Sequence, residues 1–419
     1  MHLAILTQYY PPETGAPQRR LSNLARHFRD CGHSVSVLTA MPNYPQGRTF
    51  EGYGGLYKCS VADGIQLVRS FIYPTKKTKT IPRLLSYFSF VFSSLAVGSV
   101  GLRPPDYLLI ESPPLFLGIS GYLLSRIKSA KLIFNVSDLW PESAARLGVI
   151  ARSGFGYRVA ESLEAFCYRK AWLITGQSKS ILQDIHARFP KARCFHLSNG
   201  ADSNMFQPGV RAESAASMLR KKNGEFLAAY VGLHGLAQGL EQLLAAAQAP
   251  QATRLRFLLI GDGPCKQDLQ DQVRQQELSN VEFFDLQPAD AIPALLAEVD
   301  VLLVMLKTDI PGAVPSKLYE AMAMAKPVVL VGAGEGAEIV RESECGIVVA
   351  PGDVRGLAEG LQALRLNPDL CRRLGENGRR AVLNRYDRTQ IAHKFVQFLE
   401  NDMRNTNSEC HESSAVQNL

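Results

Sequence analysis

The sequence predicts an α/β fold with two Rossmann-like domains. Short apolar runs of strand length recur along the chain, which is typical of parallel strands covered on both faces. Turn-rich loops follow several of these runs, and helical segments follow the loops. The same order of strand, loop and helix begins again in the second half. A chain of 419 residues with this repeated order is predicted to hold two domains of ordinary size.

The first half opens with a strand over residues 2–7, the loop PPETGAPQRR, a helix and a second strand over 35–39. Gly15 permits close approach of the backbone to a ligand, and Arg19 and Arg20 are placed to reach a phosphate. A plain surface loop with two solvated arginines remains the alternative.

Two further strands are predicted at 107–110 and 131–136, and the second is followed by SDLWPES. Asp138 and Glu142 then stand at the carboxyl edge of the sheet. A carboxylate at this edge can orient a sugar hydroxyl or act as a base. The alternative is that Asp138 or Ser137 only caps the next helix.

Residues 84–102 carry no charge and, as a helix, would be about 28 Å long, enough to cross a bilayer. Serines and glycines dilute their apolar character. Basic residues precede the segment: Lys76, Lys77, Lys79 and Arg83. Three interpretations stay open, namely a spanning helix, a core helix and a helix in the membrane interface. We favour the interface, and expect Phe90 and Phe92 to contribute to membrane binding.

The second half repeats the pattern after a polar, turn-rich boundary that ends the first domain at about residue 203. Strands are predicted at 226–231, 255–260 and 299–306. The loop GLHGLAQG follows the first of these strands and the tight turn GDGP follows the second. The polar tail 401–419 is predicted to be disordered.

The stretch PGAVPSKLYEAMAMAKPVVLV is the most informative one. Pro311 breaks the preceding apolar run, Ser316 is a good N-cap, and a short helix follows. Lys317 in the first turn opposes the helix dipole, which makes sense if a phosphate binds there. Glu320 lies on the same helix side and can accept hydrogen bonds from sugar hydroxyls. The alternative is a solvated Lys317 and a Glu320 that only complements the dipole.

Composition restricts the partners. The net charge of +7 is mild for this length and gives little reason to expect nucleic acid, but suits an anionic membrane surface or phosphorylated substrates. The eight cysteines show no C-x-x-C and, on our interpretation, no ligand-like spacing with histidine. We therefore expect reduced thiols in a cytoplasmic protein without a signal peptide, and no zinc site.

Several blocks in order resemble a bacterial family-4 glycosyltransferase of the GT-B architecture. They are YYPPETGAPQRR, GHSVSVLT, SDLWPES, SNGADSNMF, YVGLHGLAQGLE, LIGDGP, PSKLYEAMAMAKPVV and CGIVVAPGD. The similarity runs from Met1 to about Leu399. The DLWPES and PSK-x-YEAMA forms most resemble the exopolysaccharide and O-antigen branch, including colanic-acid fucosyltransferases and N-acetylfucosamine transferases.

The resemblance implies an acceptor-side domain over 1–203, a nucleotide-sugar domain over 204–384, a helix over 385–400 that returns to the first domain, and a cleft between the domains. Glu320 would hold the donor ribose, Ser316 and Lys317 would face the diphosphate, and Asp138 would lie near the transferred sugar. Other residues expected to contact the donor lie in loops after strands: Gly15, Arg19, Gly232, His234, Gly261 and Gly263. Such enzymes retain the anomeric configuration and use no metal or other cofactor in the site.

Two positions depart from the family pattern. Gly312 stands where the E-x(7)-E motif needs its first glutamate, and the loop from Gly232 lacks the basic pair often seen there. His234 or Lys317 would then replace the missing charge.

The leading hypothesis is a retaining glycosyltransferase at the inner face of the plasma membrane. It would move a sugar from a UDP- or GDP-sugar to a polyprenyl-diphosphate-linked saccharide. A sugar-nucleotide 2-epimerase and a non-catalytic nucleotide-sugar-binding subunit are the alternatives. The sugar, the base and the oligomeric state stay open.

Overall fold

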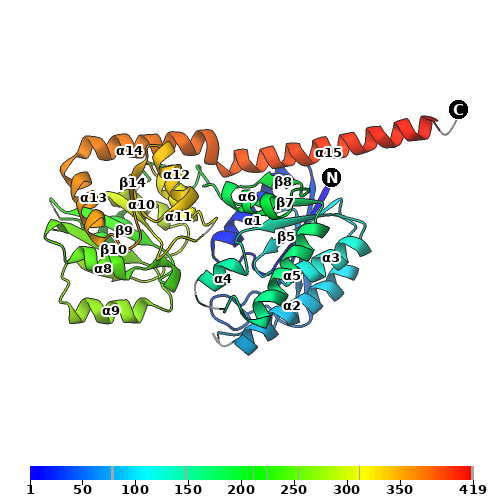
Figure 1. The fold of residues 1–419 in the computed structure, drawn as a ribbon, viewed down its shortest axis with the longest axis horizontal. Helices are drawn as coiled ribbons and strands as arrows, with labels where there is room; N and C mark the ends of the chain where they lie inside the picture. The colour runs from blue at the N-terminus through cyan, green and yellow to red at the C-terminus, as the bar shows by residue number, and fades with distance from the viewer. Residues whose placement is uncertain are drawn as a thin grey trace. The chain divides into compact units, whose positions relative to one another are not determined.

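The computed structural model describes residues 1–76, 80–146, 148, 150–210, 212–222, 224–252, 254–310 and 312–416, with side chains to residue 405. Lys77, Lys79 and Pro311, which the sequence argument used, lie outside the described residues. The chain forms two compact units (Figure 1). The first comprises Met1–Ser198 and the chain from Arg388 onward, and the second comprises Asn199–Asp387. The boundaries predicted from the sequence were 203/204 and 384/385.

The first unit alternates strands and helices. Its strands are β1 (His2–Thr7), β2 (Ser34–Ala40), β3 (Tyr57–Ala62), β4 (Ile65–Ser70), β5 (Tyr107–Ser112), β6 (Lys131–Val136), β7 (Leu173–Gly176) and β8 (Cys194–His196). Its helices are α1 (Ala16–Asp30), α2 (Thr80–Gly101), α3 (Leu117–Ile127), α4 (Glu142–Arg146), α5 (Phe155–Lys170), α6 (Lys179–Arg188) and α15 (Arg388–Val416).

The strands of this unit form one sheet in the order β3-β4-β2-β1-β5-β6-β7-β8. Only the edge pair β3–β4 is antiparallel among the described pairings. Helices α1 and α15 cover one face, and α2, α3, α5 and α6 cover the other. Both faces of the central strands are therefore covered, which is why these strands read as continuous apolar runs, whereas the edge strand β3 is exposed along its length.

The second unit contains the strands β9 (Phe226–Val231), β10 (Leu255–Ile260), β11 (Val281–Phe284), β12 (Val301–Met305), β13 (Val328–Val331) and β14 (Gly346–Val349). Its helices are α7 (Glu213–Leu219), α8 (Glu241–Ala247), α9 (Lys266–Gln275), α10 (Ile292–Glu298), α11 (Ser316–Ala323), α12 (Gly334–Glu342), α13 (Val354–Leu366) and α14 (Pro368–Ala381). Short 3-10 turns lie at Leu236–Gln238 and Pro250–Ala252, and a π-helical turn lies at Val382–Tyr386.

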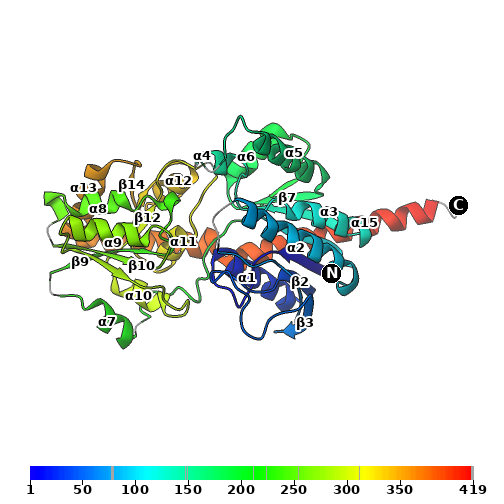
Figure 2. The ribbon, with the colours of Figure 1, turned by 90° about the horizontal axis from the view of Figure 1, so that it is seen from below.

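This sheet is parallel throughout its described pairings and has the order β11-β10-β9-β12-β13-β14. Helices α8, α9 and α13 pack on one face, and α7, α10, α11 and α12 pack on the other (Figure 2). Alternate residues of β9 enter the two cores: Leu227 packs on one side and Ala228 on the other. The predicted α/β fold with two domains of parallel strands is confirmed.

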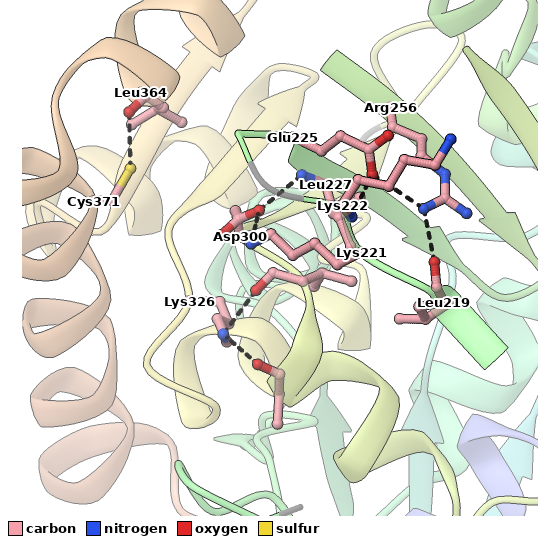
Figure 3. Close-up of polar contacts among 12 residues, drawn as sticks. Leu219, Lys221, Lys222, Glu225, Leu227, Arg256, Asp300, Lys326, Leu364 and Cys371 are labelled. Atoms are coloured by element: carbon pink, nitrogen blue, oxygen red, sulfur yellow. Dashed lines mark hydrogen bonds and ion pairs between the residues drawn. The ribbon is translucent and has the colours of Figure 1, made fainter. Parts of the chain in front are cut away.

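Ion pairs and hydrogen bonds connect the strands at the amino edge of the second sheet (Figure 3). Asp300, just before β12, accepts hydrogen bonds from Lys221 Nζ at 2.7 Å and from the Leu227 amide at 2.8 Å. Arg256 on β10 pairs with Glu282 at 2.6 Å and donates to the Leu219 carbonyl at 2.7 Å. These contacts fix the strands at the edge opposite to the one where ligands bind in open α/β sheets.

Helix α2 packs on the first sheet by one face. Its serines meet protein groups: Ser93 donates to Ser70 Oγ at 3.1 Å and Ser94 donates to Ser120 Oγ of α3 at 3.2 Å. Phe90 is fully buried in the core, whereas Phe92 is 69% exposed. By length and composition the helix is also long enough and apolar enough to cross a membrane. The exposed side is apolar, because Ile81, Leu85, Phe92 and Val100 lie on it.

The polar end of the chain is helical. Helix α15 continues to Val416, so the predicted disorder from residue 401 is wrong for the described part of the tail. The reason is an anchor: Asp402 accepts hydrogen bonds from Lys131 Nζ at 2.6 Å, Arg193 Nη1 at 2.8 Å and Tyr107 Oη at 3.0 Å. Composition alone does not show these partners.

Candidate functional site

The second sheet has a topological switch point between β9 and β12. The chain proceeds from β9 to β10 on one side, whereas β12, its other neighbour, leads to β13 and β14. In open α/β sheets ligands bind outside the carboxyl ends of the strands at such a point. The loops that follow β9 and β12 meet here, since the Lys307 amide donates to the Ala237 carbonyl at 2.8 Å.

Helix α11 begins at this carboxyl edge. Its N-cap is Pro315 rather than Ser316, so the predicted N-cap is wrong by one residue. Proline fits because an N-cap has extended backbone and this one has φ −61° and ψ 130°. Ser316 is the first helical residue, and Lys317 lies in the first turn as predicted. The amides of a first helical turn have no partner within the helix, which favours an anion in front of them.

The ammonium of Lys317 reaches back across the sheet edge to the loop after β9. A Cβ placed on Gly232 would stand 2.6 Å from Lys317 Nζ and would displace this flexible side chain, and the φ of 136° at this position itself favours glycine. The ammonium also lies 5.2 Å from the centre of the Tyr230 ring. Lys317 thus brings a cation to the place where the loop from Gly232 lacks its own basic pair.

The loops after β9 and β10 extend the parallel ladder beyond the strand ends. The Gly232 amide donates to the Ile260 carbonyl at 2.8 Å, and the His234 amide donates to the Asp262 carbonyl at 2.9 Å. A Cβ on Gly261 would lie 2.9 Å from the Gly232 carbonyl carbon, and one on Gly263 would lie 2.7 Å from the His234 carbonyl carbon. Glycine is needed at both positions because the two loops run in backbone contact.

His234 is fully buried between Tyr230 and Phe283, with ring centroids 6.0 Å away on both sides. Within the described part of the chain, neither of its ring nitrogens has a hydrogen-bond partner. Burial, helped by the charges of Lys266 and Lys317, lowers the pKa of His234 to about 4. The imidazole is therefore neutral at pH 7, so of these two residues only Lys317 carries a positive charge beside the loop from Gly232.

Glu320 lies one turn after Lys317 on α11 and is half-buried. Its predicted partner, the residue eight positions earlier, is Gly312, which has φ 77°. A glutamate rarely adopts this left-handed conformation, so the loop before α11 is built on a turn that disfavours the family's first glutamate.

Lys266 is a residue that the sequence reasoning missed. It starts α9, and its ammonium donates to the Gly261 carbonyl at 2.9 Å and to Asp285 at 2.7 Å. It therefore holds the GDGP turn against β11. A lysine two residues after the GDGP turn, at the start of a helix, was the available signal.

In the first unit, the β1–α1 loop brings Gly15 to the N-cap of α1. Arg19 follows in the first turn and is half-buried. Arg20, the other arginine that was expected to reach a phosphate, is buried in contacts with protein groups. It forms a buried ion pair with Glu111 at 2.5 Å and donates to Ser137 Oγ at 3.0 Å. The reason is that β5, next to β1, ends in a carboxylate that the sequence argument did not use.

Asp138 follows β6 and accepts a hydrogen bond from Ser143 Oγ at 2.9 Å. Helix α4 begins only at Glu142, so neither Asp138 nor Ser137 is its N-cap. Burial raises the pKa of Asp138, against the lowering effect of its hydrogen bonds from Ser143 and the Leu139 amide. A raised pKa makes this carboxylate a stronger base than an exposed aspartate. Glu142 forms an ion pair with Arg146 and accepts a hydrogen bond from Tyr157.

A cavity of about 220 Å³ opens in the first unit beside α2. It is lined by ends of loops that follow β1, β2 and β4 and by the first turns of α2. Its aromatic and cationic residues are Tyr9, Tyr44, Tyr87, Lys76 and Arg83. Tyrosine faces and basic groups suit a ligand that carries both sugar rings and negative charge.

A second cavity of about 950 Å³ lies at the amino edge of the second sheet. Its lining includes Arg256, which already forms ion pairs with Glu225 and Glu282. Its position opposite the carboxyl edge argues against it as the principal site, because ligands of open sheets bind at the carboxyl edge.

Two family models match the chain and together cover most of it. The model "Glycosyl transferase 4-like domain" matches residues 15–200, and the model "Glycosyl transferases group 1" matches residues 213–381. The fold and these matches define the class: this is a glycosyltransferase of the GT-B fold.

Two relatives narrow the class. The chain is 29% identical to the colanic acid biosynthesis glycosyl transferase WcaI of Escherichia coli over 86% of this chain and 91% of WcaI. It is 27% identical to the glycosyltransferase WbjE of Pseudomonas aeruginosa over 72% of this chain and 75% of WbjE. The chain belongs to the family-4 GT-B glycosyltransferases and is similar to members of the exopolysaccharide and O-antigen branch, as the motifs indicated.

Solved structures agree on the fold. Sucrose-phosphate synthase from Thermosynechococcus elongatus superposes with a TM-score of 0.77 at 17% identity, over 96% of this chain and 99% of that one. HepE from Anabaena, solved with UDP-glucose, gives a TM-score of 0.70 at 20% identity, over 96% of this chain and all of HepE. At such identities the likeness shows the fold alone.

Proposed function

We propose that this glycosyltransferase moves a sugar from a UDP- or GDP-sugar to a lipid-linked saccharide, with retention of the anomeric configuration and without a metal ion in the site. The pathway that we propose is assembly of an extracellular polysaccharide or O-antigen. Similarity to WcaI and WbjE over most of the chain supports the pathway. The second unit would take the donor and the first unit the acceptor.

One observation carries the donor assignment: the Lys317 ammonium lies against Gly232, at the start of α11 and at the switch point between β9 and β12. A helix N-terminus and a lysine at one point offer amides and a cation to the same anion. The diphosphate of a nucleotide sugar is the anion that we assign to this place. HepE has been solved with UDP and with UDP-glucose, which supports a donor of this class here.

The proposed chemistry needs stabilisation of one leaving group. The bond from the anomeric carbon to the β-phosphate oxygen breaks, and an acceptor hydroxyl oxygen forms the new bond on the same face. The hydroxyl proton passes to a base, and the nucleoside diphosphate leaves with the electron pair. Lys317 and the α11 amides stabilise the charge that develops on the diphosphate, the role that a divalent ion has in metal-dependent enzymes.

Two residues complete the proposed machinery. Glu320, one turn beyond Lys317, accepts hydrogen bonds from the donor ribose. Asp138 in the first unit orients the acceptor hydroxyl or takes its proton, a role that the raised pKa of its carboxyl supports. The nearby cavity that Tyr9, Tyr44 and Arg83 help to line is our candidate for the charged, sugar-bearing end of the acceptor.

We propose that α2 holds the protein at the inner face of the plasma membrane. A lipid-linked acceptor keeps its lipid in the bilayer, so the enzyme must work at the surface. The exposed apolar side of α2, with Phe92 and Leu85, can insert to the level of the acyl chains while its serine-bearing side stays on the protein. Arg83, at the start of the same helix, suits anionic headgroups.

Labelled UDP- and GDP-sugars, incubated with the protein and polyprenyl-diphosphate saccharides in vesicles, test this proposal. Transfer from one donor is expected, and added magnesium should leave kcat/KM of metal-stripped protein unchanged within about twofold. Glu320→Ala should lower kcat/KM at least about 100-fold, because the ribose hydroxyls lose a charged acceptor. Glu338→Ala on the exposed side of α12 is the matched control.

The non-catalytic alternative makes a different prediction. A binding subunit would show heat on titration with UDP or GDP but no transfer or hydrolysis of any donor. Absence of binding to both nucleotides would contradict the donor assignment itself.

A further inference from the structure

A cluster of two histidines and a cysteine lies on the first unit, away from the residues assigned to either substrate. His27 and Cys31 lie one turn apart at the C-terminal end of α1, and His393 comes from α15. One potential ligand atom from each residue lies within 4.8 Å of the other two. His27 is twelve residues beyond Gly15, which is about 18 Å along the helix.

The spacing of the Cys31 and His27 ligand atoms fits a zinc ion. A zinc with a sulfur at about 2.3 Å and a nitrogen at about 2.0 Å in tetrahedral geometry holds those two atoms about 3.5 Å apart. The observed separation of Cys31 Sγ and His27 Nε2 is 3.6 Å. The sequence analysis counted no ligand-like spacing between cysteine and histidine, but His27 and Cys31 lie four residues apart, and residues at this interval share one face of a helix.

Packing between α1 and α15 supports the cluster. Phe28 of α1 and Phe395 of α15 meet edge to face at 6.0 Å, within the core that the two helices share. The ring centroids of His27 and His393, on the same two helices, lie 5.8 Å apart. Both donor helices are therefore fixed, and a metal would find its ligands already close together.

The surroundings suit a cation. Acidic groups lie close to the cluster, because Asp30 directly precedes Cys31 and Glu400 of α15 pairs with His33 at 3.0 Å. His393 is exposed, so a metal has a path from solvent and a water can fill a fourth position.

We infer that His27, Cys31 and His393 form a zinc-binding site that clamps α15 to α1. The chain re-enters the first unit at the beginning of α15, so the ion would secure the returning segment rather than take part in transfer. Thiolate and imidazole donors together favour Zn²⁺ over Mg²⁺ or Ca²⁺, which prefer oxygen ligands.

Titration of the metal-stripped full-length protein with Zn²⁺ and Co²⁺ tests this inference. One equivalent of Zn²⁺ should bind and raise the midpoint of thermal unfolding. Co²⁺ should give a thiolate-to-metal charge-transfer band that Cys31→Ser abolishes. His393→Gln, a change at an exposed position, should weaken Zn²⁺ binding at least about tenfold while its metal-free unfolding midpoint stays that of the wild type.

Controls separate this site from adventitious binding. Cys59→Ser and His186→Gln change an exposed cysteine and an exposed histidine of the same unit and should leave the Zn²⁺ affinity unchanged. Zinc binding that survives both Cys31→Ser and His393→Gln, or a cobalt spectrum without the thiolate band, would overturn the inference.

Discussion

The ammonium of Lys317 occupies the space in front of Gly232, where a Cβ would come within 2.6 Å of Nζ. Gly232 lies in the loop after β9, and Lys317 lies in the first turn of α11, the helix that follows β12; β9 and β12 are the strands on either side of the switch point. A cation from this helix thus supplies what the loop from Gly232 lacks. The proposed donor site depends on this relationship.

Replacement of Lys317 by methionine should lower kcat/KM by about 100-fold, because the leaving diphosphate loses its cation while the length of the side chain is kept. UDP or GDP affinity, measured by calorimetry, should fall as well. Lys221→Met is the matched control, since Lys221 pairs with Asp300 at the opposite edge of the same sheet. Equal activity of the two variants would remove Lys317 from the site.

His234 should make stability depend on pH. Folding lowers its pKa from 6.5 to about 4, so the neutral form stabilises the native state fully above about pH 6.5. As the pH falls from 6.5 toward 4, the unfolded chain takes up the proton first and this contribution is lost. The loss at pH 4.5 should be about 2–3 kcal/mol.

The measurement compares free energies of unfolding by urea at pH 7.5 and 4.5 for the wild type and His234→Phe. Phenylalanine retains the ring between Tyr230 and Phe283 but cannot be protonated. The variant should lose about 2–3 kcal/mol less than the wild type on acidification. Identical losses would mean that His234 is not buried as a neutral group.

Replacement of one partner of the buried ion pair between Arg20 and Glu111 should lower the free energy of unfolding. Glu111→Ala removes the carboxylate that neutralises the buried guanidinium and should reduce the free energy of unfolding by about 3–5 kcal/mol. The double change Arg20→Met with Glu111→Leu removes both charges and should cost less. A double-mutant cycle in urea measures the coupling, and additive effects would contradict it.

Membrane binding should depend on the exposed side of α2. Leu85, Phe92 and Val100 changed together to serine should release the protein from vesicles that contain phosphatidylglycerol, because these side chains face away from the core. Leu286→Ser with Leu366→Ser removes exposed apolar groups from the second unit and serves as the control. Sedimentation measures the bound fraction, and unchanged binding of the triple variant would exclude α2 as the anchor.

Phe90→Ser has a different expected outcome from any change on the exposed side. Phe90 is fully buried, so its replacement should destabilise the fold by about 3–5 kcal/mol rather than report on lipid. The sequence predicted that Phe90 and Phe92 would both serve membrane binding. Two positions apart on a helix, they point to different sides, and only the packing of α2 on the sheet decides which side is covered.

The sequence by itself determined the two-domain α/β fold, the glycosyltransferase family and the placement of Lys317 at the start of a helix after a buried strand. These follow from local patterns, since apolar runs, turn residues and ordered motifs are read within a few neighbours. Tertiary structure alone decided what lies opposite each side chain. It paired Arg20 with Glu111, buried His234 as a neutral group, anchored Asp402 and brought His393 to Cys31. Such partners come from distant segments, and their effects on charge and pKa depend on distances that no local pattern contains.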